Sequence, residues 1–142
     1  YKVSAKVDGK SKFVKKIVVT TASPHDSKMF PDLMDESDRG QVAFADSAYV
    51  GQEETLQKYG LKDEICEKGY RGNPLTDEQR EENRKKSVIR SRVEHVFGFM
   101  EGAMHGLTVR TIGIARATAH IFLKCLTYNM FRYEQFVRNG IR

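Results

Sequence analysis

The longest regular pattern in the sequence runs from Thr76 to Gly102 and indicates one uninterrupted helix. Thr76 suits the N-cap position and Gln79 stands three residues later, which is the arrangement of a capping box. At 1.5 Å per residue this helix is roughly 37 Å long. Apolar residues recur along its second half at spacings of four, three and four, at Ile89, Val93, Val96 and Met100. Any fold of this chain must therefore bury one stripe of a long helix.

Shorter patterns on both sides of this helix predict strands and further helices. Residues 1–7 and 13–21 are strand-like and flank Asp8-Gly9, which is a hairpin turn signal. Ser23 can cap a helix that begins at Pro24, has Asp26 at its third position and is kinked or split by Pro31. The other expected elements are a strand at 42–45, a short helix closed by Gly60, a strand at 61–69 and a helix at 114–131. This last helix is apolar on most faces, as expected for a helix buried against the sheet or in an interface.

This order of elements predicts a mixed α/β fold. The chain has 142 residues, of which 39% are hydrophobic, so residues 1–142 are expected to form a single domain with a real core. Cys66 and Cys125 lie far apart and belong to no Cys-x-x-Cys pair, which argues against a disulfide framework or a zinc site. No signal segment opens the sequence and no apolar run reaches the roughly 18 residues of a membrane span. We therefore expect a soluble, cytoplasmic protein with reduced thiols.

The charge balance permits a nucleic-acid partner without requiring one. The net charge is +5, and residues 84–92 hold five basic residues and no acidic one. Four of these are candidate phosphate contacts, namely Lys85, Lys86, Arg90 and Arg92. The alternative is that a charge run on a helix is only its solvated face.

Asp46 stands directly after the strand predicted at 42–45, followed by the small residues Ser47 and Ala48. Ligands of open α/β sheets collect beyond the carboxyl ends of the strands, which makes Asp46 a candidate site residue. An aspartate followed by a serine after a strand is also an ordinary turn or helix cap. Both interpretations stay open on this position alone.

Glu94 lies about 100° around the long helix from its apolar stripe, and Arg90 precedes it by one turn on the same face. A strand-end aspartate and a glutamate on a later helix of the same sheet suit a divalent-metal site for phosphoryl transfer, because Mg²⁺ prefers carboxylate oxygens. Two carboxylates are few for a pair of metals, so a third acid from another strand is expected.

Four stretches of the sequence together resemble one protein family. They are "VTTASPHDS", "FADSAYVG", "RSRVEHVFG" and "TAHIFLKCLTYNMFR", and they occur in the order found in the DDE transposases of bacterial insertion sequences. These enzymes are members of the retroviral-integrase superfamily with an RNase H-like fold. By this resemblance Asp46 is the second acid and Glu94 the third acid of the Asp-Asp-Glu triad. Ser87 and Glu101 depart from the family, which often has a tyrosine and a basic residue at these positions.

The resemblance also implies what is missing. The first triad aspartate belongs to a strand upstream of the initial hairpin, and Asp8 does not match it. The fold implied is an RNase H-like mixed sheet flanked by helices that lacks its first, central strand. The chain is accordingly expected to be the C-terminal part of a longer transposase, and to be inactive alone.

The implied function is metal-dependent DNA transposition. Mg²⁺ or Mn²⁺ held by Asp46 and Glu94 would serve cleavage of DNA at terminal inverted repeats, after which the freed 3′-OH would attack target DNA. A homodimer acting in the bacterial cytoplasm, at the nucleoid, is expected. The alternatives are a non-catalytic DNA-binding remnant of a transposase and an RNase H-like nuclease that hydrolyses DNA without strand transfer.

Among the remaining polar residues, His25 and Asp26 are interpreted as cap and turn residues and His120 as an interior histidine. Tyr49 is expected to pack against the sheet rather than to contact DNA.

Overall fold

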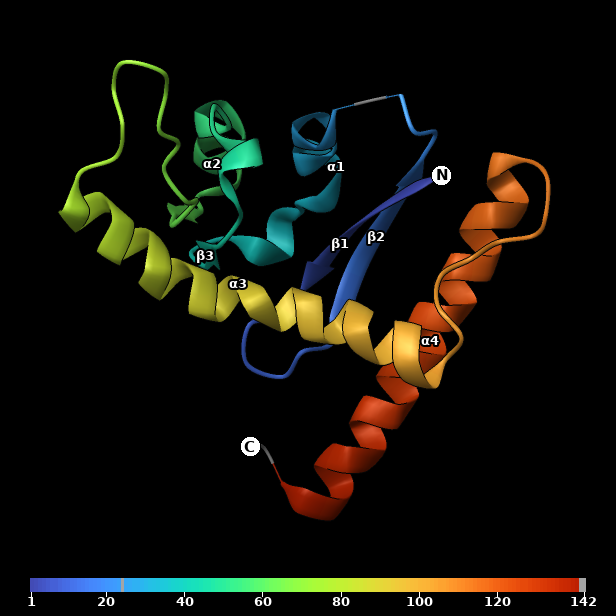
Figure 1. The fold of residues 1–142 in the computed structure, drawn as a ribbon. Coiled ribbons are helices and arrows are strands. Elements are labelled where there is room, and N and C mark those ends of the chain that lie inside the picture. Colours follow the sequence, from blue (N-terminus) through green and yellow to red (C-terminus); the bar gives the residue numbers. More distant parts are fainter. Residues whose placement is uncertain (24, 141–142) are drawn as a thin grey trace. The chain divides into compact units, whose positions relative to one another are not determined.

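A computed structural model describes residues 1–23 and 25–140 and confirms the mixed α/β class (Figure 1). The chain divides into two compact units. Residues 1–24 and 92–142 form one, called the terminal unit below, and residues 25–91 form the other, called the middle unit. One helix, α3 (Asp77–Ala103), begins in the middle unit and ends in the terminal unit.

The terminal unit begins with the predicted hairpin. Strands β1 (Lys2–Val7) and β2 (Val14–Thr20) pair antiparallel, with a bulge next to Val7. The carboxylate of Asp8 organises the loop between them, because its Oδ1 accepts hydrogen bonds from the backbone N–H of Lys10 at 3.1 Å and of Ser11 at 2.6 Å. The turn signal at Asp8-Gly9 is thus confirmed.

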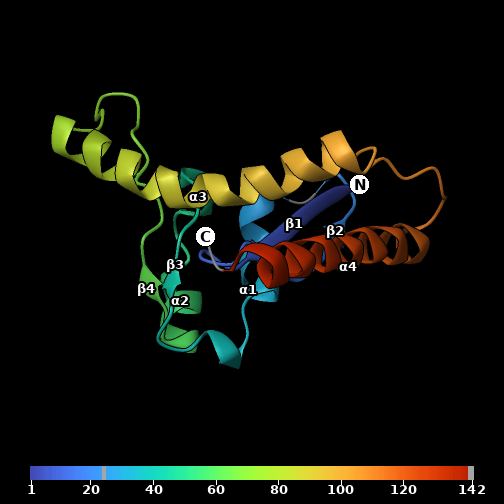
Figure 2. The ribbon, with the colours of Figure 1, turned by 90° about the horizontal axis from the view of Figure 1, so that it is seen from below.

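Helix α4 (Ile114–Asn139) packs beside β2 (Figure 2). Together with the second half of α3 and the hairpin it encloses the core of the terminal unit. Val96 and Met100 of the predicted stripe are fully buried there, which confirms that this face of α3 points into a core. The buried residues of this core are Val14, Val96, Met100, Ile121, Cys125 and Tyr128.

Asn129 fixes α4 to the edge of β2. Its Oδ1 accepts a hydrogen bond from the backbone N–H of Val14 at 2.9 Å, and its Nδ2 donates to the carbonyl of Val14 at 2.9 Å. Arg132, one turn later, donates from Nε to the carbonyl of Ser11 at 2.7 Å. These bonds satisfy backbone groups of the hairpin that would otherwise need another strand.

The structure corrects the expected end of the helix at 114–131 and the expected place of His120. No Gly or Pro interrupts the sequence before Gly140, so the helix continues to Asn139. The hairpin and α3 cover only one face of it, and His120, which was expected in the interior, is exposed.

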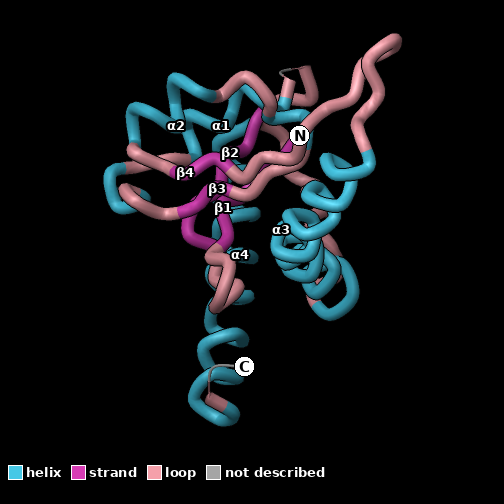
Figure 3. The backbone as a smooth tube through the Cα atoms, turned by 90° about the vertical axis from the view of Figure 1, so that its left-hand side faces the viewer, coloured by secondary structure: helices cyan, strands magenta, loops and turns pink. Residues whose placement is uncertain are grey.

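The middle unit contains the predicted strand at Asp46, although in a shorter form. β3 (Val42–Ala43) and β4 (Lys62–Asp63) pair in parallel (Figure 3). Isolated backbone hydrogen bonds extend the pairing, since the N–H of Cys66 donates to the carbonyl of Ala45 at 3.0 Å. The core of this unit consists of Phe30, Ala43, Leu56 and Ile65.

Short helices surround these strands: α1 (Phe30–Leu33), α2 (Glu53–Tyr59) and three single turns of 3₁₀ helix. Helix α2 ends at Gly60 in the left-handed conformation, φ 61°, as predicted. Pro24 lies outside the described residues, and the N-cap of the first turn is His25 rather than Ser23. A 3₁₀ turn at Asp26–Met29 leads into α1, which carries Pro31 in its first turn.

Helix α3 begins as its capping box predicts. The N–H of Thr76 donates to Oε1 of Gln79 at 2.9 Å, and the N–H of Gln79 donates to Oγ1 of Thr76 at 3.2 Å. The helix ends at Ala103, one residue beyond the predicted end. No helix within the described residues is long and apolar enough to cross a membrane.

The described strands form two separate two-stranded sheets, β1-β2 and β3-β4. The RNase H-like arrangement with a missing central strand stays a prediction.

Candidate functional site

Asp46 lies just beyond the parallel strand pair, in the middle unit. It is the N-cap of the 3₁₀ turn Ser47–Tyr49, and its Oδ1 accepts a hydrogen bond from the N–H of Ala48 at 2.8 Å. The capping interpretation of this residue is therefore confirmed. The side chain is nevertheless exposed, and a carboxylate that accepts one N–H bond retains further lone pairs on its two oxygens.

The turn that Asp46 caps is anchored to the core of the middle unit through Tyr49. The ring of Tyr49 packs against Phe30 of α1, with 5.7 Å between ring centroids, and joins the core cluster that also contains Ala43 of β3. The local backbone is thus held on both sides of Ala48, by the cap at Asp46 and by the packing of Tyr49.

A shallow pocket opens beside this turn. One wall is the segment that follows the turn, Val50–Glu53, and the other is the segment that begins at the end of β4. Three carboxylates line it, namely Glu53, Asp63 and Glu67. Asp46 is not among the lining residues, and Oδ1 of Asp63 already accepts the N–H of Ile65 at 2.8 Å.

Glu94 lies on α3 in the terminal unit, where its side chain is exposed two residues before the buried Val96. Its neighbour His95 places Nδ1 3.5 Å from Nζ of Lys12, in a pocket that Arg132 also lines. Since Asp46 and Glu94 belong to different units, the convergence of their carboxylates stays a prediction.

The four predicted DNA contacts have different surroundings. Lys85 is exposed and bonded to Glu82 at 2.7 Å. The hydrogen bond to Glu82 and the charge of that carboxylate raise the pKa of Lys85. Arg92 donates from Nη1 to the carbonyl of Gly9, and Arg90 lies half-buried one turn before Glu94.

Lys86 is the most enclosed of the four. Its side chain is only 16% exposed and pairs with Glu64 at 3.3 Å, while Nζ also donates to the carbonyl of Ile65 at 3.3 Å. These bonds hold α3 against the segment after β4. Before it could contact a phosphate, Lys86 would have to give up this contact.

A polar face of α3 that the sequence analysis overlooked supports the same segment. Asn83 accepts the N–H of Glu67 at 2.8 Å and donates to the carbonyl of Glu67 at 2.9 Å. Gln79, one turn earlier, donates to the Glu67 carboxylate at 2.5 Å. The four-residue spacing of Gln79, Asn83 and Ser87 was the available signal, because it marks one helix face.

Within the described residues, no three His, Cys, Asp or Glu side chains are grouped as a metal site would require. Cys66 and Cys125 are both free and buried. The oxygen donors Asp46 and Glu94 suit Mg²⁺ by their chemistry, but two carboxylates make an incomplete ligand set.

Comparisons with known proteins agree on one family. Residues 1–130 match the family described as "Transposase DDE domain". The chain is also 28% identical over 134 residues to the "Transposase for insertion sequence element IS1106" of Neisseria meningitidis serogroup B, covering 93% of this chain and 46% of that protein. It therefore spans about half the length of the curated relative that it matches. No solved structure matches the chain.

Proposed function

Because the chain belongs to the family of transposase DDE domains, we propose that it takes part in DNA transposition by a metal-dependent transesterification. In this proposal it forms part of the catalytic domain of a longer bacterial insertion-sequence transposase. The substrates are donor DNA ends with terminal inverted repeats and a target DNA. The observation that carries the proposal is that the family match includes both candidate acids, Asp46 and Glu94.

Asp46 is proposed as a metal ligand and the second acid of the triad. Two observations support this role: the residue follows a parallel strand, where α/β proteins commonly bind ligands, and its side chain is exposed. The N–H of Ala48 orients the carboxylate through Oδ1. The capping bond and metal binding are compatible, because a carboxylate offers about four lone-pair sites.

Glu94 is proposed as the third acid of the triad. Arg90 lies one turn before it on the same helix. The exposed carboxylate of Glu94 sits on a helix whose next turn is anchored by the buried Val96 and Met100, so its backbone position is rigid. The remaining acid of the triad would come from another segment of the longer protein.

The carboxylates act in this scheme as ligands and not as nucleophiles. When bound, Mg²⁺ or Mn²⁺ would stabilise charge on the attacking and leaving oxygens of the phosphodiester. Asp46 and Glu94 would fix its position. The first step cuts the DNA at the element's end, and the freed 3′-OH attacks target DNA in the second.

The basic residues Lys85, Lys86, Arg90 and Arg92 are proposed to bind DNA phosphates. Lys85 is the most accessible of them, with 62% of its side chain exposed. Contacts of this kind weaken as salt rises, because binding releases counterions from the DNA. The reaction is placed at the nucleoid, in the cytoplasm, and the active species is a homodimer.

The test is made in the full-length transposase that carries this chain. Asp46→Asn and Glu94→Gln each remove one charged oxygen at constant size. We expect each to reduce cleavage of a labelled insertion-sequence end by at least about 1,000-fold, an effect typical of removing a transition-state contact. DNA binding in a mobility-shift assay should change by less than about threefold.

Glu54→Gln is the matched control, since Glu54 is an exposed carboxylate in the first turn of α2. This variant should cleave like the unchanged protein. Full cleavage by either Asp46→Asn or Glu94→Gln would reject the assignment of that residue.

The same experiment separates the two rival functions. A non-catalytic remnant would bind the DNA ends without cutting them even when unchanged. An RNase H-like nuclease would release hydrolysed products but form no joint between the cut end and target DNA.

A further inference from the structure

Helix α4 has two apolar faces, and only one of them is used within its unit. The buried face consists of Ala117, Ile121, Cys125 and Tyr128, which point into the core of the terminal unit. A helix that is apolar on several sides is normally buried on several sides. The second face therefore calls for a partner.

That second face is a regular stripe. Leu123, Leu126, Met130, Tyr133 and Val137 follow one another at spacings of three, four, three and four residues. At 100° per residue, the mean direction of the stripe lies roughly 165° from that of the buried face. Exposed fractions are 60% for Leu123, 48% for Leu126, 64% for Met130, 65% for Tyr133 and 69% for Val137.

Spacings that alternate between three and four give an average period of 3.5, the pattern of the a and d positions of a coiled coil. Such a seam selects another helix as its partner, because knobs of one helix enter holes of the other. The stripe itself carries no charge, so a partner with a charged face would gain nothing from it. A helix with the same seam matches it best.

We propose that this surface, called the α4 stripe, pairs with the α4 stripe of a second copy of the chain. The proposal names the contact surface of the homodimer proposed above and rests on that part of the proposed function. It uses no part of the metal chemistry, since it is argued only from the surface of α4. A two-fold symmetric pair buries both stripes against each other and leaves no free stripe to which a third copy could bind.

The size of the surface is sufficient for a specific pair. Leu123 and Val137 are about 21 Å apart along the helix at 1.5 Å per residue. With Phe122, which is 57% exposed beside Leu123, the stripe offers six large apolar side chains. At on the order of 100 Å² each, a pair would bury about 1,200 Å² in total, which is the lower end of stable interfaces.

The first measurement is the mass of the 142-residue chain in solution by sedimentation equilibrium. The monomer has a mass of 16.2 kDa, so a pair doubles that value. The test variant is Leu126→Lys with Met130→Lys, which places two charges in the centre of the stripe. We expect it to raise the dissociation constant of the pair by at least about 100-fold.

Val88→Lys is the matched control. Val88 is 65% exposed on α3 and so resembles the stripe residues in type and exposure, but it lies on a different helix. This variant should dimerise like the unchanged chain. Circular dichroism of all variants should be the same, because the substituted side chains are exposed.

A second variant tests contact directly. Met130→Cys, treated with a short bismaleimide alone or mixed with Leu126→Cys, should give a covalent dimer, whereas Val88→Cys should not. A chain that stays monomeric at about 100 μM, or that forms an open series of larger species, would overturn the proposal. So would a pair that persists in the double-lysine variant. The Met130→Cys cross-linking is therefore repeated in the full-length transposase: a stripe covered by another segment of the longer protein would give no covalent dimer there, even if the isolated chain pairs, and this too would overturn the proposal.

Discussion

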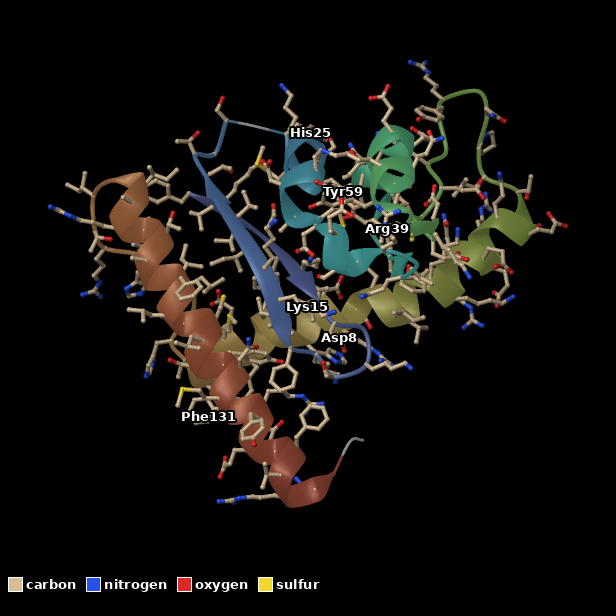
Figure 4. The ribbon with its side chains drawn as sticks, turned by 180° about the vertical axis from the view of Figure 1, so that it is seen from behind. Asp8, Lys15, His25, Arg39, Tyr59 and Phe131 are labelled. Atoms are coloured by element: carbon tan, nitrogen blue, oxygen red, sulfur yellow. The ribbon has the colours of Figure 1, made fainter. Side chains whose placement is uncertain are left out.

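Asp8 shows how one side chain organises the loop of the terminal hairpin. Its carboxylate holds the hairpin loop through the backbone of Lys10 and Ser11 and the hydroxyl of Ser11, the last at 2.6 Å. Lys15 lies 3.7 Å from its other oxygen (Figure 4). Partial burial raises the pKa of Asp8, but the hydrogen bonds from Ser11 and Lys10 and the charge of Lys15 outweigh this, so the pKa lies below 3.8.

This lowered pKa predicts a pH dependence of stability. A carboxyl whose pKa is lower in the folded state stabilises the fold above its unfolded value, and the contribution is lost as the pH falls through the folded value. We expect Asp8→Asn to unfold at lower urea concentration than the unchanged chain at neutral pH. The gap between the two urea midpoints should narrow as the pH falls below 3.8.

Urea titrations at several pH values measure this gap. Ser11→Ala, which removes one of the three bonds to Asp8, should show the same trend with a smaller amplitude. A gap that is constant between about pH 7 and pH 2 would contradict the role assigned to the carboxylate.

The role of a single residue was predicted correctly from the sequence where the residue bonds to groups close to it along the chain. The cap at Thr76 and the turn at Asp8 depend on groups two or three positions away, and both were predicted. The ion pair of Lys86 with Glu64 and the two hydrogen bonds between Asn83 and Glu67 join segments that lie apart in the sequence. The spacing of polar residues marks the helix face that makes such bonds, but it does not identify the partners.

At the scale of elements, α3 and the hairpin strands β1 and β2 were predicted closely, whereas the end of α4 and the strands of the middle unit were not. Helix α3 ends within one residue of its prediction, because its caps and its spacing are encoded locally. The strands β3 and β4 are only two residues each, since a strand forms only where a partner is available to bond with it. The position of Asp46 after a strand was predictable because it depends on a local pattern. Its distance from Glu94 was not, because it depends on segments that lie apart in the sequence.

Replacing Gly98 or Gly60 by alanine is predicted to change the free energy of unfolding in opposite directions. Gly98 lies within α3, and an added Cβ would meet nothing within 4 Å. We expect Gly98→Ala to raise the free energy of unfolding by about 0.5–1 kcal/mol, because alanine loses less backbone entropy in a helix.

Gly60 is the matched opposite case. It ends α2 with φ +61°, a conformation that costs other residues about 1–2 kcal/mol, so Gly60→Ala should lower the free energy of unfolding. Urea denaturation of both variants measures the sign of each change in the free energy of unfolding. Destabilisation by Gly98→Ala would mean that this position of α3 is closely covered.

At the scale of the whole molecule, each compact unit has a buried cluster of its own. Met100 is fully buried in the terminal unit, and Leu56 is 5% exposed in the middle unit. The sequence predicted one domain, and α3 is the element through which the two units are continuous. A single cooperative domain would unfold both clusters together.

Two core substitutions test this prediction. Met100→Ala and Leu56→Ala should each cost about 2–5 kcal/mol of stability, while Val88→Ala, at an exposed site, should cost less than about 0.5 kcal/mol. Hydrogen exchange measured by mass spectrometry reports both units at once. If the domain is single, each core variant loses protection in both units. Loss confined to the substituted unit would show two independent folding units.

The bonds between Asn129 and Val14 also have a consequence for the solubility of the folded chain. An exposed strand edge can recruit the edge of another chain, which is how many proteins begin to aggregate. Because the side-chain amide occupies both backbone groups of Val14, it blocks the outer edge of β2 where the strand begins. The side chain of a helix residue thus prevents another strand from pairing with β2 at Val14, and it does so without adding a charge or a proline to the strand.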